Sequence, residues 1–174
     1  MDVQHYRSTV ALRHGLEVTL RAIRPDDGEK LLAAYRNLEP RSIYTRFFAA
    51  RKEPTAAELA AATNIDFDTT VALVAIMSGK TGETIIGGGR YVVLPQSEPR
   101  SAEVAFMTEE DYQGLGLAGL ILRELASIAL AKGVVKFIAE VLPANAAMLS
   151  VFRRCGKEMK TSIESGLLHV EIIL

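Results

Sequence analysis

The sequence predicts a single α+β domain, residues 1–174, built around a mixed β-sheet. The first observation is a set of short segments in which apolar and polar residues alternate with period two, as in half-buried strands. The second is the order of these segments among helical patterns, β-α-α-β-β-β-α-β-α-β-β, in which early neighbours pair antiparallel and one later helix crosses over between adjacent strands. The third is a composition of 49% hydrophobic and 24% charged residues, which is ordinary for one folded domain of this length.

The first third of the chain contains one strand followed by helical segments. Residues 1–15 have little periodicity and predict an N-terminal arm or a short extra strand. Apolar residues alternate with polar ones over 16–23, which predicts a half-buried strand. Asp26 or Asp27 can then cap a helix, and Thr55 begins the capping-box pattern of a short alanine-rich helix.

Three strands are predicted in the middle of the chain. The apolar run over 70–77 has the pattern of a central strand that is covered on both faces. A turn separates it from 84–93, which we expect to pair back as a hairpin, and 102–107 forms the third strand. The consecutive glycines Gly87–Gly89 predict a bulge or a close backbone approach, because no helix follows them as it would in a phosphate loop.

The last third begins with a long helix and ends with two strands. The helix begins at Leu117, and Gly133 is suited to end it. The remaining elements are a buried strand, a helix and the two final strands, predicted at 134–142, 145–155, 158–163 and 167–174.

A glycine-rich turn from Gln113 to Gly119 lies between the strand at 102–107 and the long helix. Glycines at 114, 116 and 119 let the backbone turn tightly and bring N–H groups close to a ligand. The first turn of the helix has unpaired N–H groups and the positive end of the helix dipole, which together attract a di- or triphosphate. The turn matches neither a dinucleotide fingerprint, since 108–112 separates it from the strand, nor a P-loop, since no Lys-Ser/Thr follows. The alternative is an ordinary glycine-containing turn before a core helix.

The same turn resembles motif A of the GNAT N-acetyltransferases, Gln/Arg-x-x-Gly-x-Gly/Ala, with Gln113, Gly116 and Ala118 at its fixed positions. The resemblance implies a GNAT-like fold with a mixed sheet of about six to seven strands and about four helices. It also implies that acetyl-CoA is the co-substrate, with its pyrophosphate on the turn and its pantetheine arm along the preceding strand. The residues implied in coenzyme binding are Phe106, Met107, Thr108, Gln113, Gly114, Leu115, Gly116, Leu117, Ala118 and Gly119.

A second resemblance covers 140–156, which is similar to motif B of that family. An asparagine begins the helix of motif B, and the residues alone give Asn145 the role of helix N-cap. The family adds a hydrogen bond near the coenzyme arm, and Phe152 is implied to lie at that arm too. Many members have a tyrosine at the position of Phe152, thought to protonate the leaving thiolate. Phenylalanine has no proton to donate, and the branch of bacterial protein-lysine acetyltransferases commonly lacks the tyrosine as well.

Acetyl transfer to an amine needs a base that takes a proton from the acceptor, directly or through one water. Glu103, on the strand before the glycine-rich turn, is the residue that the resemblance favours for this role. Without the resemblance, the preferred interpretation of Glu103 is an edge-strand carboxylate that faces solvent. Glu140, on the neighbouring strand, is the alternative catalytic residue.

The segment 39–48 interleaves aromatic residues with arginines. Stacking on nucleic-acid bases is one interpretation, and a helical lid whose aromatic side chains pack inward is the preferred one. Residues 42–48, Ser-x-Tyr-x-Arg-Phe-Phe, resemble a segment in GNAT domains of bacterial protein-lysine acetyltransferases, where this segment lines the acceptor groove. Tyr44, Arg46 and Phe47 are therefore implied in acceptor binding.

Charge and composition exclude several other functions. Twenty basic and twenty-one acidic residues give a formal net charge of −1, so we expect no nucleic-acid partner. The single cysteine, Cys155, excludes an internal disulfide and fits a reducing cytoplasm. His5, His14 and His169 lack ligand spacing, so no metal site is expected. No segment has the length and apolarity of a membrane span, and we expect a cytoplasmic protein.

These observations favour an acetyl-CoA-dependent N-acetyltransferase that transfers an acetyl group to a primary amine directly in a ternary complex. The resemblance favours a protein lysine as acceptor, with a small-molecule amine second. The alternative is a CoA-binding regulatory module without turnover, for which Phe152 is the one sequence hint. The apolar final strand favours a homodimer formed through the C-terminal sheet.

Overall fold

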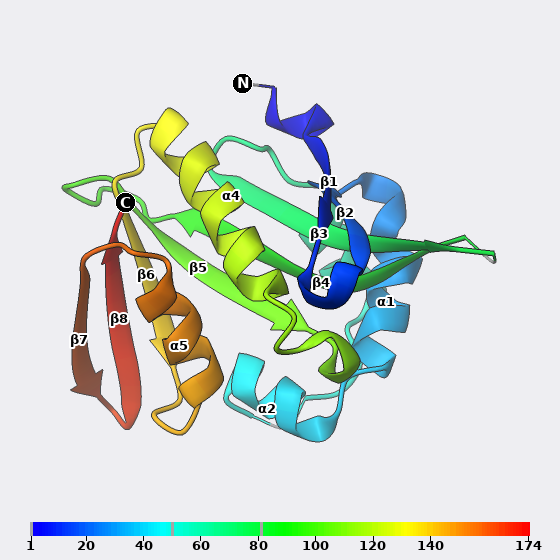
Figure 1. The fold of residues 1–174 in the computed structure, drawn as a ribbon. Helices are drawn as coiled ribbons and strands as arrows, with labels where there is room; N and C mark the ends of the chain where they lie inside the picture. The colour runs from blue at the N-terminus through cyan, green and yellow to red at the C-terminus, as the bar shows by residue number, and fades with distance from the viewer. Residues whose placement is uncertain (1, 50, 81) are drawn as a thin grey trace.

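A computed structural model describes residues 2–49, 51–80 and 82–174, and in this part of the chain an eight-stranded sheet has the order β1-β2-β3-β4-β5-β6-β8-β7. Figure 1 shows the sheet with helices on both faces. The strands are β1 Arg7–Ala11, β2 Glu17–Ala22, β3 Thr70–Gly79, β4 Gly82–Val93, β5 Ser101–Thr108, β6 Lys136–Val141, β7 Met159–Glu164 and β8 Leu167–Ile173. The helices are α1 Gly28–Arg36, α2 Pro40–Phe47, α3 Ala56–Thr63, α4 Leu117–Ala131 and α5 Ala146–Arg154.

The predicted α+β fold with a mixed sheet is confirmed. In the described residues the sheet has eight strands, one more than the six to seven expected. The added strand is β1, which pairs with β2 from Arg7↔Arg21 to Ala11↔Glu17. It lies in the N-terminal segment, for which the sequence predicted either an arm or a short extra strand. Helices in the described residues number five rather than about four, because the segment between α1 and β3 divides into α2 and α3.

One pair of neighbouring strands is parallel, and the others described are antiparallel. β5 and β6 run parallel, and α4 connects them as the predicted crossover helix. Strands β1 to β5 follow one another in antiparallel register, and β8 lies between β6 and β7. The chain therefore changes its pairing pattern at β5 and β6, in the middle of the sheet.

Helix α4 packs across β3, β4 and β5, and α5 lies beside it on the same face of the sheet (Figure 1). The apolar side chains of α4 cover more than one stripe of the helix surface, as expected for a helix that contacts both the sheet and a second helix. Burying each such side chain contributes roughly 1.5–3 kcal/mol. The buried large residues of α4 are Leu117, Leu120, Ile121, Leu122, Leu125 and Ile128.

The glycines of β4 bring α4 close to the sheet. A Cβ on Gly89 would lie 2.7 Å from Ile121 of α4 and 2.8 Å from the ring of Phe106. One on Gly87 would lie 2.9 Å from the carbonyl oxygen of Met107. The register of β3 against β4 also shifts between Ala75 and Ile76, which is a bulge. Both features that the glycine run predicted, a close approach and a bulge, are present.

A buried ion pair fixes the start of α1. The guanidinium of Arg21 donates to both carboxylate oxygens of Asp27 at 2.7 and 2.8 Å, and the Arg24 N–H donates to the same carboxylate at 2.8 Å. Burial raises the pKa of Asp27, but these hydrogen bonds outweigh burial, so the pKa lies below its usual value. Helix α1 lies on the sheet face opposite α4 (Figure 1), and α2 after it contacts β5.

Candidate active site

The candidate active site lies where β5 and β6 separate. Their pairing covers only Ser101↔Lys136, Ala102↔Phe137 and Glu103↔Ile138. Beyond Glu103, β5 continues to Thr108 without a partner on that side in the described residues, and Figure 1 shows the two strands diverging. Unpaired backbone N–H and C=O groups at a strand edge can bind an extended, amide-containing ligand. This strand edge is the first component of the site.

The glycine-rich turn forms the second component, at the start of α4. Gly114 and Gly116 have φ of 76° and 92°, in the left-handed region that favours glycine. Gly116 is the N-cap of α4 and offers no side-chain cap, so N–H groups of the first turn remain available. A Cβ on Gly114 or Gly116 would meet nothing within 4 Å, which leaves open space in front of the turn. Gly119 lies within the helix and does not have a positive φ.

The N-terminal arm holds this turn from outside. The backbone N–H of Arg13 donates to the carbonyl oxygen of Leu115 at 3.2 Å, and its guanidinium donates to that of Gly114 at 3.3 Å. Sequence reasoning did not find this contact, because the partners lie 101 residues apart and Arg13 belongs to a segment without periodicity. Arg13 therefore holds both carbonyl groups of the turn in place.

Gln113 connects the turn to its neighbours. Its side-chain amide donates to the carbonyl oxygen of Thr108 at 3.1 Å and to the hydroxyl of Ser42 on α2 at 3.3 Å. Nearby, the side chain of Asn37 donates to Glu109 at 3.3 Å. Burial raises the pKa of Glu109, with a smaller opposing effect of the Asn37 hydrogen bond. The end of β5 is thus linked to the segment between α1 and α2.

The other residues implied in coenzyme binding also lie around this strand end. Phe106 is buried and packs edgewise on Phe152 of α5, with ring centroids 6.1 Å apart. Asn145 caps α5, since its side-chain oxygen accepts from the Met148 N–H at 3.1 Å, as the residues alone predicted. Met107, Thr108, Leu115, Ala118 and Gly119 are half-buried, and Leu117 is buried in the core.

Glu103 lies on the opposite face of the same strand. Because side chains alternate along β5, Glu103 points away from the face on which Val104 and Phe106 are buried. Its carboxylate is exposed and has no ion pair within 4.0 Å among the described residues. A carboxylate at the last paired position of β5 is therefore next to the point where the strands open.

Glu140, the alternative base, lies on β6 and is also exposed. It is 3.7 Å from the imidazole of His169 on β8, which in turn is 3.8 Å from Glu164 on β7. Glu140 therefore belongs to a polar group on β6, β7 and β8. Of the two carboxylates, Glu103 is the one without such a partner.

Helix α2 places the predicted acceptor residues on the side of Glu103. Phe47 is half-buried against Tyr35, with ring centroids 6.5 Å apart, and the guanidinium of Arg46 lies 5.0 Å from the Phe47 centroid. The expectation that the aromatic residues pack inward is correct for Phe47 and wrong for Tyr44, which is 50% exposed. A two-turn helix that contacts β5 with one side leaves Tyr44 on its other side.

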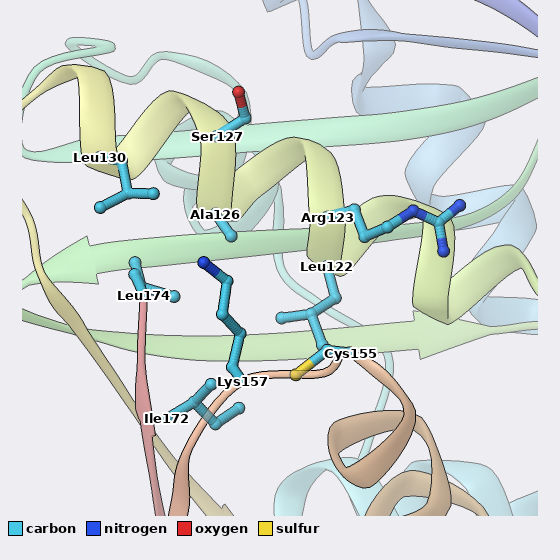
Figure 2. Close-up of a pocket in the computed structure, with 9 residues that line it drawn as sticks. All are labelled: Leu122, Arg123, Ala126, Ser127, Leu130, Cys155, Lys157, Ile172 and Leu174. Carbon is cyan, nitrogen blue, oxygen red and sulfur yellow. The ribbon is translucent and has the colours of Figure 1, made fainter.

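A shallow groove of about 280 Å³ lies elsewhere, between the second half of α4 and the C-terminal strand (Figure 2). Leu122, Ala126 and Leu130 of α4 point into the groove from one side, and Cys155 and Lys157 lie on the other. Cys155 is half-buried there, as expected of a packed helical cysteine. Over residues 2–49, 51–80 and 82–174, no cluster of three metal-ligating side chains is found, and no described helix is long and apolar enough to cross a membrane.

Residues 37–157 match the model of the acetyltransferase (GNAT) family. An acetyltransferase of Pseudomonas aeruginosa is 30% identical over 138 residues, which cover 79% of this chain and 73% of that protein. Acetyltransferase Pat of Mycolicibacterium smegmatis is 33% identical over 147 residues, 84% of this chain but 43% of that longer protein. The crystal structure of the GNAT domain of PAT from S. lividans superposes with a TM-score of 0.87 at 35% identity, covering 97% of both chains.

The structural match extends over the whole sheet, and the family match includes the strand edge, the glycine-rich turn and α5. Sequence, fold and site therefore agree that this chain belongs to the GNAT family of acetyltransferases.

Proposed function

We propose that this acetyltransferase transfers the acetyl group of acetyl-CoA, the donor used by its family, to the side-chain amine of a protein lysine, directly in a ternary complex. One observation carries the proposal. Past Glu103 the edge of β5 is open, the glycine-rich turn lies at its far end on the α4 side, and Glu103 faces the other side. Donor and acceptor can therefore approach the same strand from opposite faces of the sheet.

The residues on the α4 side fit acetyl-CoA. Its pyrophosphate suits the free N–H groups between Gly114 and the first turn of α4, in the open space where a Cβ would meet nothing. The amides of its pantetheine arm suit the unpaired edge of β5, from Val104 to Thr108. The ring pair of Phe106 and Phe152 supplies an apolar wall beside that edge.

The residues on the other side fit proton removal from an amine. An ammonium group cannot attack until it loses a proton, and the Glu103 carboxylate is placed to accept that proton directly or through one water. The amine nitrogen then forms a bond to the thioester carbonyl carbon, the carbon–sulfur bond breaks, and the nitrogen loses its second proton to solvent to give the neutral amide. Solvent supplies the proton that the thiolate takes up, because Phe152 has none.

A protein acceptor is supported by the accessibility of Glu103 and by the amino-acid pattern of residues 42–48, at the end of α2, which resembles that of protein-lysine acetyltransferases. Glu103 is exposed beside a helix rather than enclosed in a small cavity, which suits a lysine presented on a polypeptide. We also propose that two copies pair through the C-terminal sheet. There β7 is the edge strand and Ile163 is 69% exposed. Light scattering of the purified chain tests that proposal.

Two measurements on the purified protein test the proposed function. Acetyl-CoA at about 100-fold over its Kd should stabilise the fold by about 2.7 kcal/mol, seen as a higher melting temperature. Thiol release should then appear with lysine peptides and be weaker with small amines. A thermal shift without thiol release for any amine would instead indicate a binding module, and the absence of both would refute the proposal.

A further inference from the structure

Arginines from two elements lie beside Glu103 on the acceptor side of the sheet. Arg90 is on β4 directly opposite Ala105, and Glu103 is opposite Val92, so Arg90 and Glu103 are diagonal neighbours on one face. Helix α2 packs on β5 over this face and adds Arg46. We refer to Arg46 and Arg90 as the arginine pair.

The position of Arg46 is supported by its surroundings. Its guanidinium stacks on the ring of Phe47 at 5.0 Å, and that of Arg51 lies 4.6 Å from the same ring. Phe47 in turn packs on Tyr35 of α1. The half-buried Arg46 is therefore held against an aromatic surface rather than extended into solvent.

Glu103 is an anion beside the arginine pair, but neither arginine forms an ion pair with it. Arg51 is bonded to Glu58, whereas neither Arg46 nor Arg90 has an ion pair within 4.0 Å among the described residues. Burial, and to a smaller extent the charge of Arg90, lower the pKa of Arg46 to about 10, against the opposite effect of Glu103. Arg46 is still a cation at neutral pH. Arg90 is exposed and is solvated by water, whereas the half-buried Arg46 is a cation that a bound anion would stabilise.

We propose that the acceptor has a carboxylate close to its reactive amine, and that Arg46 and Arg90 bind this carboxylate while Glu103 receives the ammonium group. The inference rests on the proposed function and specifies its acceptor class. The carboxylate can belong to an acidic residue that flanks the lysine in a polypeptide, or it can be the α-carboxylate of a lysine at the C-terminus of a polypeptide.

The charge arrangement also explains how the acceptor is oriented. The ammonium group is attracted by Glu103 and repelled by the arginine pair, while a carboxylate on the same acceptor experiences the reverse. An acceptor with both groups is therefore held in one orientation, with its amine at the open strand edge. An acceptor flanked by basic residues places like charges together and is disfavoured.

Matched acceptors test the inference. The first arm compares capped peptides in which a lysine is flanked by glutamate or by glutamine, and the second compares Nα-acetyl-lysine with its C-terminal amide. We expect kcat/KM to be about tenfold higher for the carboxylate member of at least one pair, and the ratio to fall as salt is added. The arm that shows the preference identifies the source of the carboxylate.

Variants of Arg46 and Arg90 test whether the arginine pair causes the preference for a carboxylate-bearing acceptor. Arg90→Gln, at an exposed position, should reduce the ratio to near one while leaving acetyl-CoA binding unchanged, and Arg46→Gln should do the same with its fold checked by circular dichroism. Arg7→Gln removes the same charge from the exposed edge strand β1 and should keep the full ratio. Equal rates for both members of both pairs, or a preference that survives in both variants, would overturn the inference while the proposed function stands. No product with any acceptor would overturn both.

Discussion

The two faces of β5 are built from different chemistry. On the α4 side, the site consists of backbone groups, glycines and buried apolar side chains. On the other side it consists of exposed or half-buried charged side chains, chiefly Glu103, Arg46 and Arg90. A ligand that does not change from one turnover to the next, and that contains amides and phosphates, can be bound by backbone N–H and C=O groups. An acceptor that differs between relatives needs side chains, which can change without altering the fold.

The largest expected effect is on the side-chain face. Glu103→Gln keeps the shape of the side chain and removes its charge, so acetyl-CoA should bind normally while turnover at neutral pH falls by about 10²–10⁴-fold. The loss should shrink at alkaline pH, where more of the amine is already deprotonated. Steady-state rates across pH measure this. Glu140→Gln is the matched control, and a larger loss in that variant would transfer the catalytic role to Glu140.

The backbone face should respond to changes of main-chain conformation. Gly116→Val places a β-branched residue at φ 92° and a side chain in the open space before the turn, so acetyl-CoA affinity should fall by about 10- to 100-fold. Titration calorimetry measures the affinity. Gly119→Ala is the control, because that glycine has no positive φ and its Cβ would meet only Arg123, at 3.9 Å. A folded Gly116→Val protein with parental affinity would show that the turn is not the phosphate site.

A smaller effect, on the stability of the fold, is expected where α4 packs on β4 on this same face. Gly89→Ala introduces a Cβ 2.7 Å from Ile121 and should destabilise the fold by about 1–3 kcal/mol through overpacking. Urea unfolding measures this loss. Gly28→Ala at the start of α1 meets nothing within 4 Å and should not destabilise. If Gly89→Ala retained full stability, the close contact of α4 with β4 would not be needed.

The smallest expected change in activity is at Phe152. This ring is 1% exposed and packs on Phe106, so Phe152→Tyr should leave turnover unchanged and lower stability by about 1–3 kcal/mol if the new hydroxyl is unsatisfied. Thiol release and urea unfolding are measured together. A faster enzyme would instead show that the hydroxyl reaches the leaving thiolate, and that the phenylalanine limits the parental rate.

Local patterns were sufficient for most of the secondary structure. Period-two alternation located β2 and β8, and a continuous apolar run located the central strand β3. The capping box at Thr55 is present, with the Glu58 N–H donating to the threonine hydroxyl at 3.2 Å. These elements were predictable because their determinants lie within a few residues of one another in the chain.

The sequence by itself determined the order of β2 to β8 and of the helices other than α2, the left-handed Gly114 and Gly116 of the turn and the cap at Asn145, because each depends on local backbone preferences. Only the tertiary structure decided where β5 and β6 part, that Arg13 holds the turn, and that Arg90 lies beside Glu103 and Arg46. Strand register and helix packing set these neighbours, and both depend on burial summed over the whole sheet rather than on any short segment. The turn could therefore be found from its own residues, whereas the charged surface around Glu103 combines residues from α2, β4 and β5.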